Sequence, residues 1–250
     1  MTPPPVPEPF YWTSAPCGVV LRCRALDAVA PHVFTTRELR LSSGDDWRRV
    51  ADAVDAERVV TLEQVHGRDV VTVTRDVAPR TGRPRADAIA STHPAVAVAV
   101  RAADCVPILI ADPATGAVAA VHAGWRGTAA GVARAALTTL EARFGADPRN
   151  LVVAIGPSIG ACCYRVGLDV RDAFAAAGHS ALDRWFVRRD PDVRLDLVAA
   201  TRDQLMAAGV PERQIHACGL CTAMHLDVLT SFRAEKEQAG RLAAAIRARA

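Results

Sequence analysis

Short apolar runs rich in valine recur along the chain, and they restrict its fold more than any other feature. Runs this short, separated by polar or turn-forming residues, predict β-strands. Three of them are almost continuously hydrophobic, which predicts strands at the centre of a sheet that is covered on both faces. The predicted strands comprise residues 19–23, 59–65, 70–73, 96–100, 106–111, 118–123 and 151–155.

Helical patterns alternate with these runs. Residues 43–54 begin with Ser43, a suitable N-cap, followed by two acidic residues that favour the positive end of the helix dipole. Residues 128–144 have helical apolar spacing and precede a glycine, and residues 195–208 end before Gly209. Residues 238–249, rich in alanine and arginine, predict a terminal helix. The chain is therefore expected to mix helices and strands, with a topology that these patterns leave open.

Size and composition favour one folded unit. The chain has 250 residues, of which 50% are hydrophobic and 23% charged, so it can bury a large core without disulfides or metal. No linker divides it. We expect a single catalytic domain over residues 18–250, preceded by a poorly ordered, proline-rich arm over residues 1–17.

Charge and cysteine usage exclude several classes of partner. The net charge of +3 comes from arginines that are scattered among acidic residues, whereas a nucleic-acid surface requires a basic cluster. The longest apolar runs are too short to cross a membrane. Seven cysteines without a secretory signal predict reduced thiols. We expect a cytoplasmic protein without nucleic-acid or membrane partners, and its oligomeric state is not predicted.

Polar residues interrupt the apolar strands at three places. His66 ends one predicted strand next to a glycine, and His122 precedes a glycine-bracketed turn that leads into a helix. Arg101, Asp104 and Cys105 lie between two strongly apolar strands, where burial of charge without partners is costly. Such strand ends commonly carry functional side chains, although each residue alone is more often structural.

Two histidines and one cysteine form a donor set that suits zinc. Imidazole nitrogen and thiolate sulfur are its usual ligands, and three protein ligands leave a fourth position open for water or substrate. That count favours a catalytic site over a closed structural one. The spacing of His66, Cys105 and His122 matches no compact zinc motif, so the residues alone only suggest this site.

Several motifs resemble, in order and spacing, those of the YfiH-like family, long labelled multicopper polyphenol oxidases or laccases. The resemblance spans roughly residues 32 to 246. Its central motifs are QVHG at 64–67, ADA at 86–88, ADCVP at 103–107 and VHAGWRGT at 121–128. Further matches are AIGPSIG at 154–160, Cys163-Tyr164, LDL at 195–197, Cys221-Thr222, SFR at 231–233 and Gly240-Arg241.

The resemblance implies a fold and an activity. The family fold is a single α+β domain layered as an α/β/β/α sandwich with mixed sheets, similar in plan to cysteine-hydrolase-like toxins. Family members are zinc-dependent purine nucleoside phosphorylases that act on adenosine, inosine, guanosine and methylthioadenosine, and they also deaminate adenosine. The residues that match His66, Cys105 and His122 bind zinc and form the catalytic centre, with copper a possible substitute. A bacterial subset is linked to the editing of peptidoglycan precursors.

Three arginines are expected to bind an anion such as phosphate: Arg37, Arg126 and Arg233. The motif around Arg37 departs from the family because Glu38 and Leu39 replace two glycines. For Arg126 an ion pair with Asp104 is an equally good interpretation.

Two other functions stay open. Cys105 is a candidate nucleophile of an amide hydrolase with His66 or His122 as its base, or the chain is a non-catalytic zinc-binding interaction protein. Metal occupancy distinguishes the amide hydrolase from a zinc enzyme, because a nucleophilic cysteine works best without a tightly bound metal. A fourth protein ligand, such as Cys221 or His225, would support the interaction protein. The Cys218/Cys221 pair is expected to be reduced. A laccase activity is disfavoured because none of the seven histidines forms a His-x-His pair.

Overall fold

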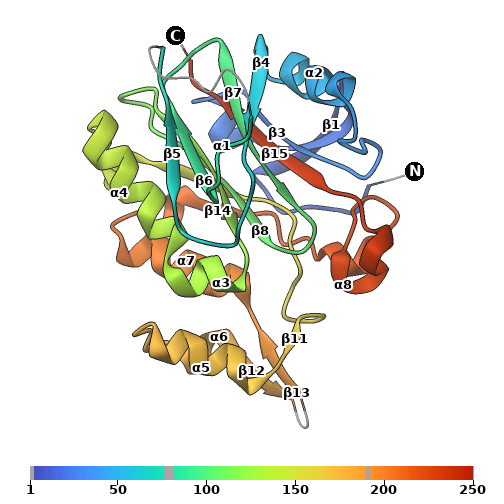
Figure 1. Ribbon diagram of the computed structural model, residues 1–250, viewed down its shortest axis with the longest axis vertical. Coiled ribbons are helices and arrows are strands. Elements are labelled where there is room, and N and C mark those ends of the chain that lie inside the picture. The colour runs from blue at the N-terminus through green and yellow to red at the C-terminus, as the bar shows by residue number, and fades with distance from the viewer. Residues whose placement is uncertain (1–2, 76–81, 190–191, 250) are drawn as a thin grey trace.

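A computed structural model describes residues 3–75, 82–189 and 192–249. Two six-stranded sheets form its centre, and a three-stranded sheet lies at one end (Figure 1). In the first six-stranded sheet only the β4/β7 pair is parallel. Its strands, in spatial order, are β1 (Phe10–Ala15), β2 (Gly18–Cys23), β3 (His32–Thr35), β15 (Leu242–Arg247), β7 (Val96–Ala102) and β4 (Arg58–Thr61).

The second six-stranded sheet is also mixed, with parallel pairs at both edges and antiparallel pairs between them. Its strands, in spatial order, are β14 (Ile215–Ala217), β10 (Val152–Ile155), β8 (Val106–Ala111), β9 (Val118–Ala123), β6 (Ala88–Ser91) and β5 (Val70–Val73). The three-stranded sheet is antiparallel and contains β11 (Arg165–Val166), β13 (Asp192–Leu195) and β12 (Phe186–Arg189).

Helices cover the outer faces of the two large sheets (Figure 1). The helices on these faces are α2 (Gly44–Ala53), α3 (Trp125–Ala130), α4 (Val132–Phe144) and α7 (Leu197–Ala207). The other helices are α1 (Arg24–Asp27), α5 (Leu168–Ala176), α6 (Leu182–Trp185) and α8 (Phe232–Glu235). Among the described residues, none of these helices has the length and apolar character that a membrane span requires.

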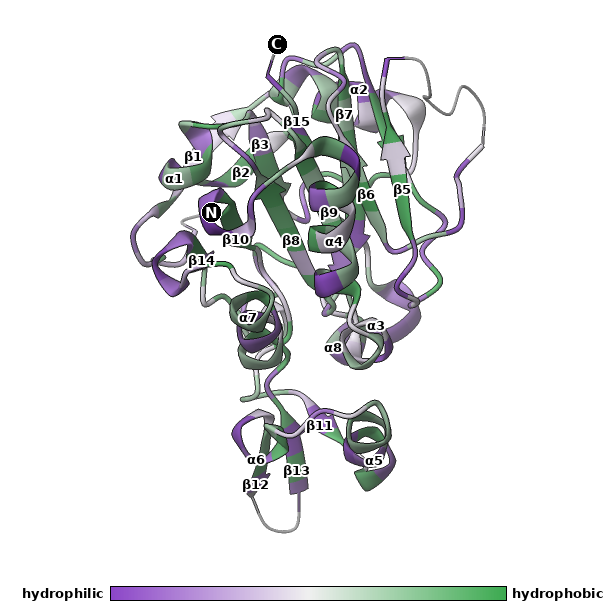
Figure 2. Ribbon diagram, turned by 90° about the vertical axis from the view of Figure 1, so that its left-hand side faces the viewer, coloured by the Kyte–Doolittle hydropathy of each residue, from purple (hydrophilic) through white to green (hydrophobic). Residues whose placement is uncertain are grey.

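The side chains of the central strands alternate between two cores. In β7, Val98 and Val100 belong to the buried cluster between the sheets, whereas Ala97 and Ala99 belong to the cluster beneath α2. In β8, Leu109 faces the other sheet, and its neighbours contact the core beneath α4 and α7. Because both faces of these strands are buried, their sequences are continuously hydrophobic. Figure 2 shows this as green colouring, which marks hydrophobic residues, along the central strands.

The layers are therefore α2, the first sheet, the second sheet, and the helices α3, α4 and α7 on the far side. The expected α+β fold with an α/β/β/α arrangement is confirmed. In both views α5, α6 and the three-stranded sheet lie together at one end (Figures 1 and 2). That residues 18–250 form one catalytic domain stays a prediction.

Most predicted elements are present. All seven predicted strands form, although β4 ends at Thr61 and leaves residues 62–69 as a loop. Helix α2 begins with a capping box in which the Ser43 hydroxyl and the Asp46 carboxylate each accept a backbone N–H. The helix predicted over residues 128–144 is two helices, because Gly131 adopts a left-handed conformation (φ +81°) between α3 and α4.

Two predictions at the ends of the chain are wrong. The alanine-rich segment 238–249, predicted as a helix, contains strand β15, which pairs with β3 and β7 and is buried on both faces. Pairing in the sheet overrides the helix propensity of alanine. The arm predicted over residues 1–17 is ordered at least over β1, which pairs with β2 along its whole length. Residues 1–2 of that arm lie outside the described part of the chain.

A buried histidine gives the fold a pH dependence. His32 in β3 is fully buried, its Nε2 accepts the Cys23 N–H, and its Nδ1 is 3.1 Å from the Ala30 carbonyl oxygen. Burial lowers its pKa to about 4, although the Ala30 hydrogen bond opposes this. Between pH 6.5 and 4 the unfolded chain binds the proton and the folded chain does not. The free energy of unfolding is therefore expected to fall by about 3 kcal/mol as pH drops through this window.

Urea unfolding of the wild type and of His32→Gln between pH 7 and 4 measures this contribution. Glutamine retains an acceptor for the Cys23 N–H and does not titrate, so its stability should decline less steeply with falling pH. Equal slopes for the two proteins would show that His32 does not titrate in this way. Histidine NMR signals of the folded wild type at pH 5 provide the same check without a variant.

Candidate metal centre and cavity

Three segments bring His66, Cys105 and His122 together. His66 lies in the loop between β4 and β5, Cys105 in the turn between β7 and β8, and His122 in β9. Their nitrogen and sulfur atoms lie within 4.8 Å of one another, and the two imidazole rings meet edge to face with centroids 5.0 Å apart. His66 is exposed, Cys105 is partly exposed and His122 is buried, so the group opens to solvent on the His66 side.

A fully buried carboxylate, Asp87, orients two of these residues. It lies directly before β6, and one of its oxygens is 2.8 Å from Nδ1 of His122. It also accepts the backbone N–H groups of Val65, His66 and Gly67, at distances of 2.6 to 3.1 Å. Since Nδ1 of His122 is engaged, its Nε2 is left for Cys105 or a metal. Sequence analysis noted Asp87 only as part of a family motif and gave it no role.

Two residues of the centre have left-handed backbone conformations that are unfavourable outside glycine: His66 (φ +61°) and Asp104 (φ +88°). Hydrogen bonds hold both. Asp87 accepts the His66 N–H, and the Asp104 carboxylate accepts the Thr222 hydroxyl and the Arg233 N–H, each at 2.6 Å. These partners replace the ion pair between Asp104 and Arg126 that was one of two sequence interpretations.

The electrostatics favour a thiolate beside a charged imidazole. Burial raises the pKa of Cys105, but hydrogen bonds and positive charge from His122 and His66 outweigh it and lower that pKa to about 6. Burial likewise opposes protonation of His122, yet Asp87 and Cys105 raise its pKa to about 9. The pKa of Asp87 is lowered despite its burial, through His122 and the backbone of residues 65–67. Cys105 is thus prepared to act as a metal ligand or a nucleophile.

The donor set and the space around it fit a zinc ion. One thiolate and two imidazoles are typical zinc ligands, and their close grouping needs little rearrangement. Gly124 permits this grouping, because a β-carbon there would lie 2.9 Å from Cys105 Sγ and 3.0 Å from the His66 ring. Within the described residues, no fourth histidine, cysteine or carboxylate joins the group. Three ligands leave a position for substrate or water.

The centre opens into a cavity of about 490 Å³. Arg101, Arg233 and Arg241 line it with positive charge, and Tyr164 and Phe232 provide aromatic surface. The remaining lining residues are Gln64, His66, Ala103, Asp104, Cys105 and His122. Gln64 exchanges two hydrogen bonds with the backbone of Arg101, so it fixes that edge of the wall. Sequence analysis assigned no role to Gln64, Tyr164 or Arg241.

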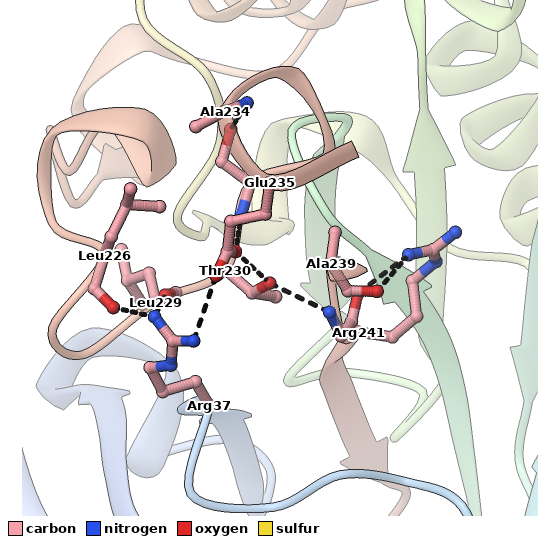
Figure 3. A network of polar contacts seen from close by, with 10 residues as sticks. Arg37, Leu226, Leu229, Thr230, Ala234, Glu235, Ala239 and Arg241 are labelled. Atoms are coloured by element: carbon pink, nitrogen blue, oxygen red, sulfur yellow. Dashed lines mark hydrogen bonds and ion pairs between the residues drawn. The ribbon is translucent and has the colours of Figure 1, made fainter. Parts of the chain in front are cut away.

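Two of the three arginines predicted to bind substrate lie off the cavity lining. Arg37 pairs with Glu235 at 2.9 Å and donates to the carbonyl oxygens of Leu226 and Leu229 (Figure 3). Glu235 in turn accepts the Thr230 hydroxyl, so this network holds the segment that carries Phe232, Arg233 and Arg241.

Arg126 is exposed, and its guanidinium stacks on the Trp125 ring at 4.2 Å. Arg233 lines the cavity, its guanidinium carbon lies 5.0 Å from the centre of the Tyr164 ring, and it donates to the Arg165 carbonyl.

Comparison with known proteins identifies the relationship. The sequence profile of the family described as multi-copper polyphenol oxidoreductase laccase matches residues 31–249. The chain belongs to this family. "Purine nucleoside phosphorylase YlmD" of Geobacillus stearothermophilus is 37% identical over 232 residues, which cover 85% of this chain and 84% of the relative.

Solved structures share the fold over nearly the whole chain. The crystal structure of YlmD from G. stearothermophilus has a TM-score of 0.82 and 32% sequence identity to this chain. The matched region covers 92% of this chain and 96% of the YlmD chain. The crystal structure of the hypothetical protein YfiH from Bacillus licheniformis has a TM-score of 0.86 and 26% sequence identity. The matched region covers 97% of this chain and 100% of the YfiH chain.

Proposed function

We propose that this chain is a zinc-dependent purine nucleoside phosphorylase that also deaminates adenosine. The observation that carries the proposal is the opening of the His66, Cys105 and His122 centre into a cavity with arginine and aromatic walls. The name of the G. stearothermophilus relative, which covers most of this chain, supports the same activity. The proposed substrates are adenosine, inosine, guanosine and methylthioadenosine, with phosphate as the second substrate.

Phosphorolysis makes defined demands on the site. A phosphate oxygen bonds to C1′ of the ribose, the bond from C1′ to the purine nitrogen breaks, and the base leaves with that electron pair and gains a proton. Arg101, Arg233 and Arg241 can meet the phosphate charge with paired hydrogen bonds. Phe232, 45% exposed at the cavity, offers a face for the purine. Ribose and base then lie near the His/Cys centre.

His66, Cys105 and His122 would hold the zinc ion, which supplies Lewis acidity or an activated water when bound. Burial raises the pKa of Tyr164 to about 12, with the nearby Cys105 charge adding to the effect. Its hydroxyl therefore keeps its proton at neutral pH and can donate to phosphate or ribose. Copper is a possible substitute at the same ligands, because it binds nitrogen and sulfur donors at least as tightly.

A cysteine hydrolase acting on an amide, such as a peptidoglycan precursor, is a second candidate. It is favoured by the chain of contacts from Cys105 to His122 to Asp87, which has the order of a nucleophile, base and orienting acid. The absence of a fourth ligand within the described residues argues against the third candidate, a non-catalytic zinc-binding interaction protein.

Inosine cleavage is expected to require phosphate. Release of hypoxanthine by metal-analysed protein, measured in phosphate-containing and phosphate-free buffer, tests this. We expect ribose 1-phosphate as the co-product and little base release without phosphate. Equal rates in the two buffers would identify a hydrolase. No nucleoside cleavage in either buffer, with amide hydrolysis by metal-free protein, would favour the cysteine hydrolase.

Arginine variants locate the phosphate site. Arg233→Lys keeps the charge but loses the planar pair of donors, so phosphate use should weaken by about 10- to 100-fold. Adenosine deamination uses water and should be largely retained. Arg213→Lys, an exposed position off the cavity, serves as the control. The roles of Arg37 and Arg126 in substrate binding stay predictions, and their lysine variants belong in the same series. An equal loss of both activities in Arg233→Lys would indicate a structural role.

A further inference from the structure

A second group of sulfur ligands lies outside the centre described above. Cys162 and Cys163 occupy the turn before β11, and Cys221 begins the short helix of residues 222–224. The three sulfur atoms lie within 4.8 Å of one another, and all three residues are free thiols. A β-bridge between Ser158 and Cys221 joins the two segments close to the sulfurs.

We propose that Cys162, Cys163 and Cys221 form a second metal site that binds a soft, thiophilic ion, Cu(I) in particular. Three sulfur donors, which no histidine or carboxylate joins among the residues that the structure describes, are the set that such an ion prefers. Metal–sulfur bonds of about 2.3 Å would place the sulfurs about 4 Å apart around a shared ion. The three sulfur atoms, which lie within 4.8 Å of one another, need only a small shift to reach that spacing.

The surroundings bring the sulfurs together. Burial, with the neighbouring thiols, raises the pKa of Cys162 to about 12, and burial also raises the pKa of Cys163, so a bound ion would have to displace these protons. The backbone N–H of Gly160 donates to Cys221 Sγ at 3.3 Å, and such a bond stabilises a thiolate ligand. A β-carbon on Gly160 would lie 3.2 Å from Cys162 Sγ and 3.4 Å from Cys221 Cβ, so a side chain there would crowd both cysteines. Arg194 donates to the carbonyl oxygens of Ala161 and Cys162 and places a positive charge beside the turn.

The site is accessible to solvent, and two of its cysteines directly precede, in the sequence, residues that line the cavity or contact its lining. Cys162 is exposed and Cys163 partly so, which allows an ion to reach Cys221 beneath them. Cys163 precedes Tyr164 of the cavity wall, and Cys221 precedes Thr222, whose hydroxyl donates to Asp104. Several thiolates repel one another unless a cation lies between them, so a bound ion would stabilise both turns. The proposal does not depend on nucleoside chemistry.

Cu(I) itself is the probe. Zinc-loaded protein is titrated anaerobically with Cu(I) against a competing chelator, and X-ray absorption identifies the ligands. We expect one Cu(I) per chain with a sulfur-only shell, and a rise in melting temperature on binding. Cys163→Ser and Cys221→Ser should each weaken binding at least tenfold. Cys218→Ala, a buried cysteine outside the group, should not.

A His66→Ala/His122→Ala variant should keep the sulfur-only copper, because it alters only the other centre. If Cys221→Ser does not fold, the exposed Cys162→Ser carries the test. The proposal is overturned if binding survives these serine substitutions or if nitrogen ligands dominate the spectrum. A disulfide between any two of the three cysteines in anaerobically isolated protein would also overturn it.

Discussion

Asp87→Asn is expected to reduce metal affinity by about 10- to 100-fold and to lower the free energy of unfolding by about 3 kcal/mol. The carboxylate is fully buried and binds His122 and three consecutive backbone N–H groups around His66. An asparagine amide replaces one acceptor oxygen with a donor, so at least one buried N–H group loses its partner. His66 then no longer holds its left-handed conformation as firmly.

The measurements are zinc content after dialysis against a weak chelator, and urea unfolding of the metal-free protein. Asp112→Asn is a matched control, because Asp112 is also fully buried but follows the end of β8 away from Cys105. Its carboxylate accepts hydrogen bonds from the Ala114 N–H and the Thr115 hydroxyl. It should lose stability and retain zinc. If Asp87→Asn keeps wild-type zinc affinity while losing stability, Asp87 supports the fold but not the ligands.

The strands were predictable because both of their faces are buried, which makes their sequences continuously hydrophobic. Val98 and Ala99 point to different cores, so neither position tolerates a polar residue. Strand β15 was not predictable in this way. Its alanines favour a helix locally, and only the neighbouring strands β3 and β7, far away in the sequence, determine the extended form.

The grouping of His66, Cys105 and His122 was predictable from residue type at strand ends, together with the family motifs. Asp87 was missed because one aspartate before a strand resembles an ordinary turn residue until its four partners are visible. Arg37 illustrates the opposite case. Its chemistry suits phosphate, yet in the structure it pairs with Glu235, a contact between residues at opposite ends of the chain that sequence alone does not indicate.

The grouping of Cys221 with Cys162 and Cys163 could not be predicted from cysteine spacing. Cys218 and Cys221 have the separation of a redox or zinc motif, but Cys218 is buried among apolar residues of the core between the two large sheets. Cys221 instead groups with Cys162 and Cys163, because the bridge at Ser158 brings two distant turns side by side. Spacing along the sequence can indicate two neighbouring cysteines in one turn. It does not indicate Cys162, Cys163 and Cys221, because only the fold brings their two turns together.

Replacing His66, Cys105 or His122 by alanine is expected to abolish zinc retention and to lower nucleoside cleavage about a thousandfold or more. Loss of the ion removes a contribution of several kcal/mol to the transition state. The fold should survive, since the cores on both sides of the two large sheets are apolar and independent of the centre. Zinc analysis, circular dichroism and inosine phosphorolysis on each variant provide the test.

His225→Ala is the matched control, because His225 lies outside the ligand group and should keep both zinc and activity. Removal of zinc from the wild type separates the two candidate reactions. A cysteine hydrolase needs a free Cys105 thiolate, so removal of zinc from the wild type should raise its activity and alkylation of Cys105 should then end it. A zinc phosphorylase loses activity on removal of the ion and regains it when zinc is restored. Full zinc retention by all three alanine variants would place the metal elsewhere and refute the assignment.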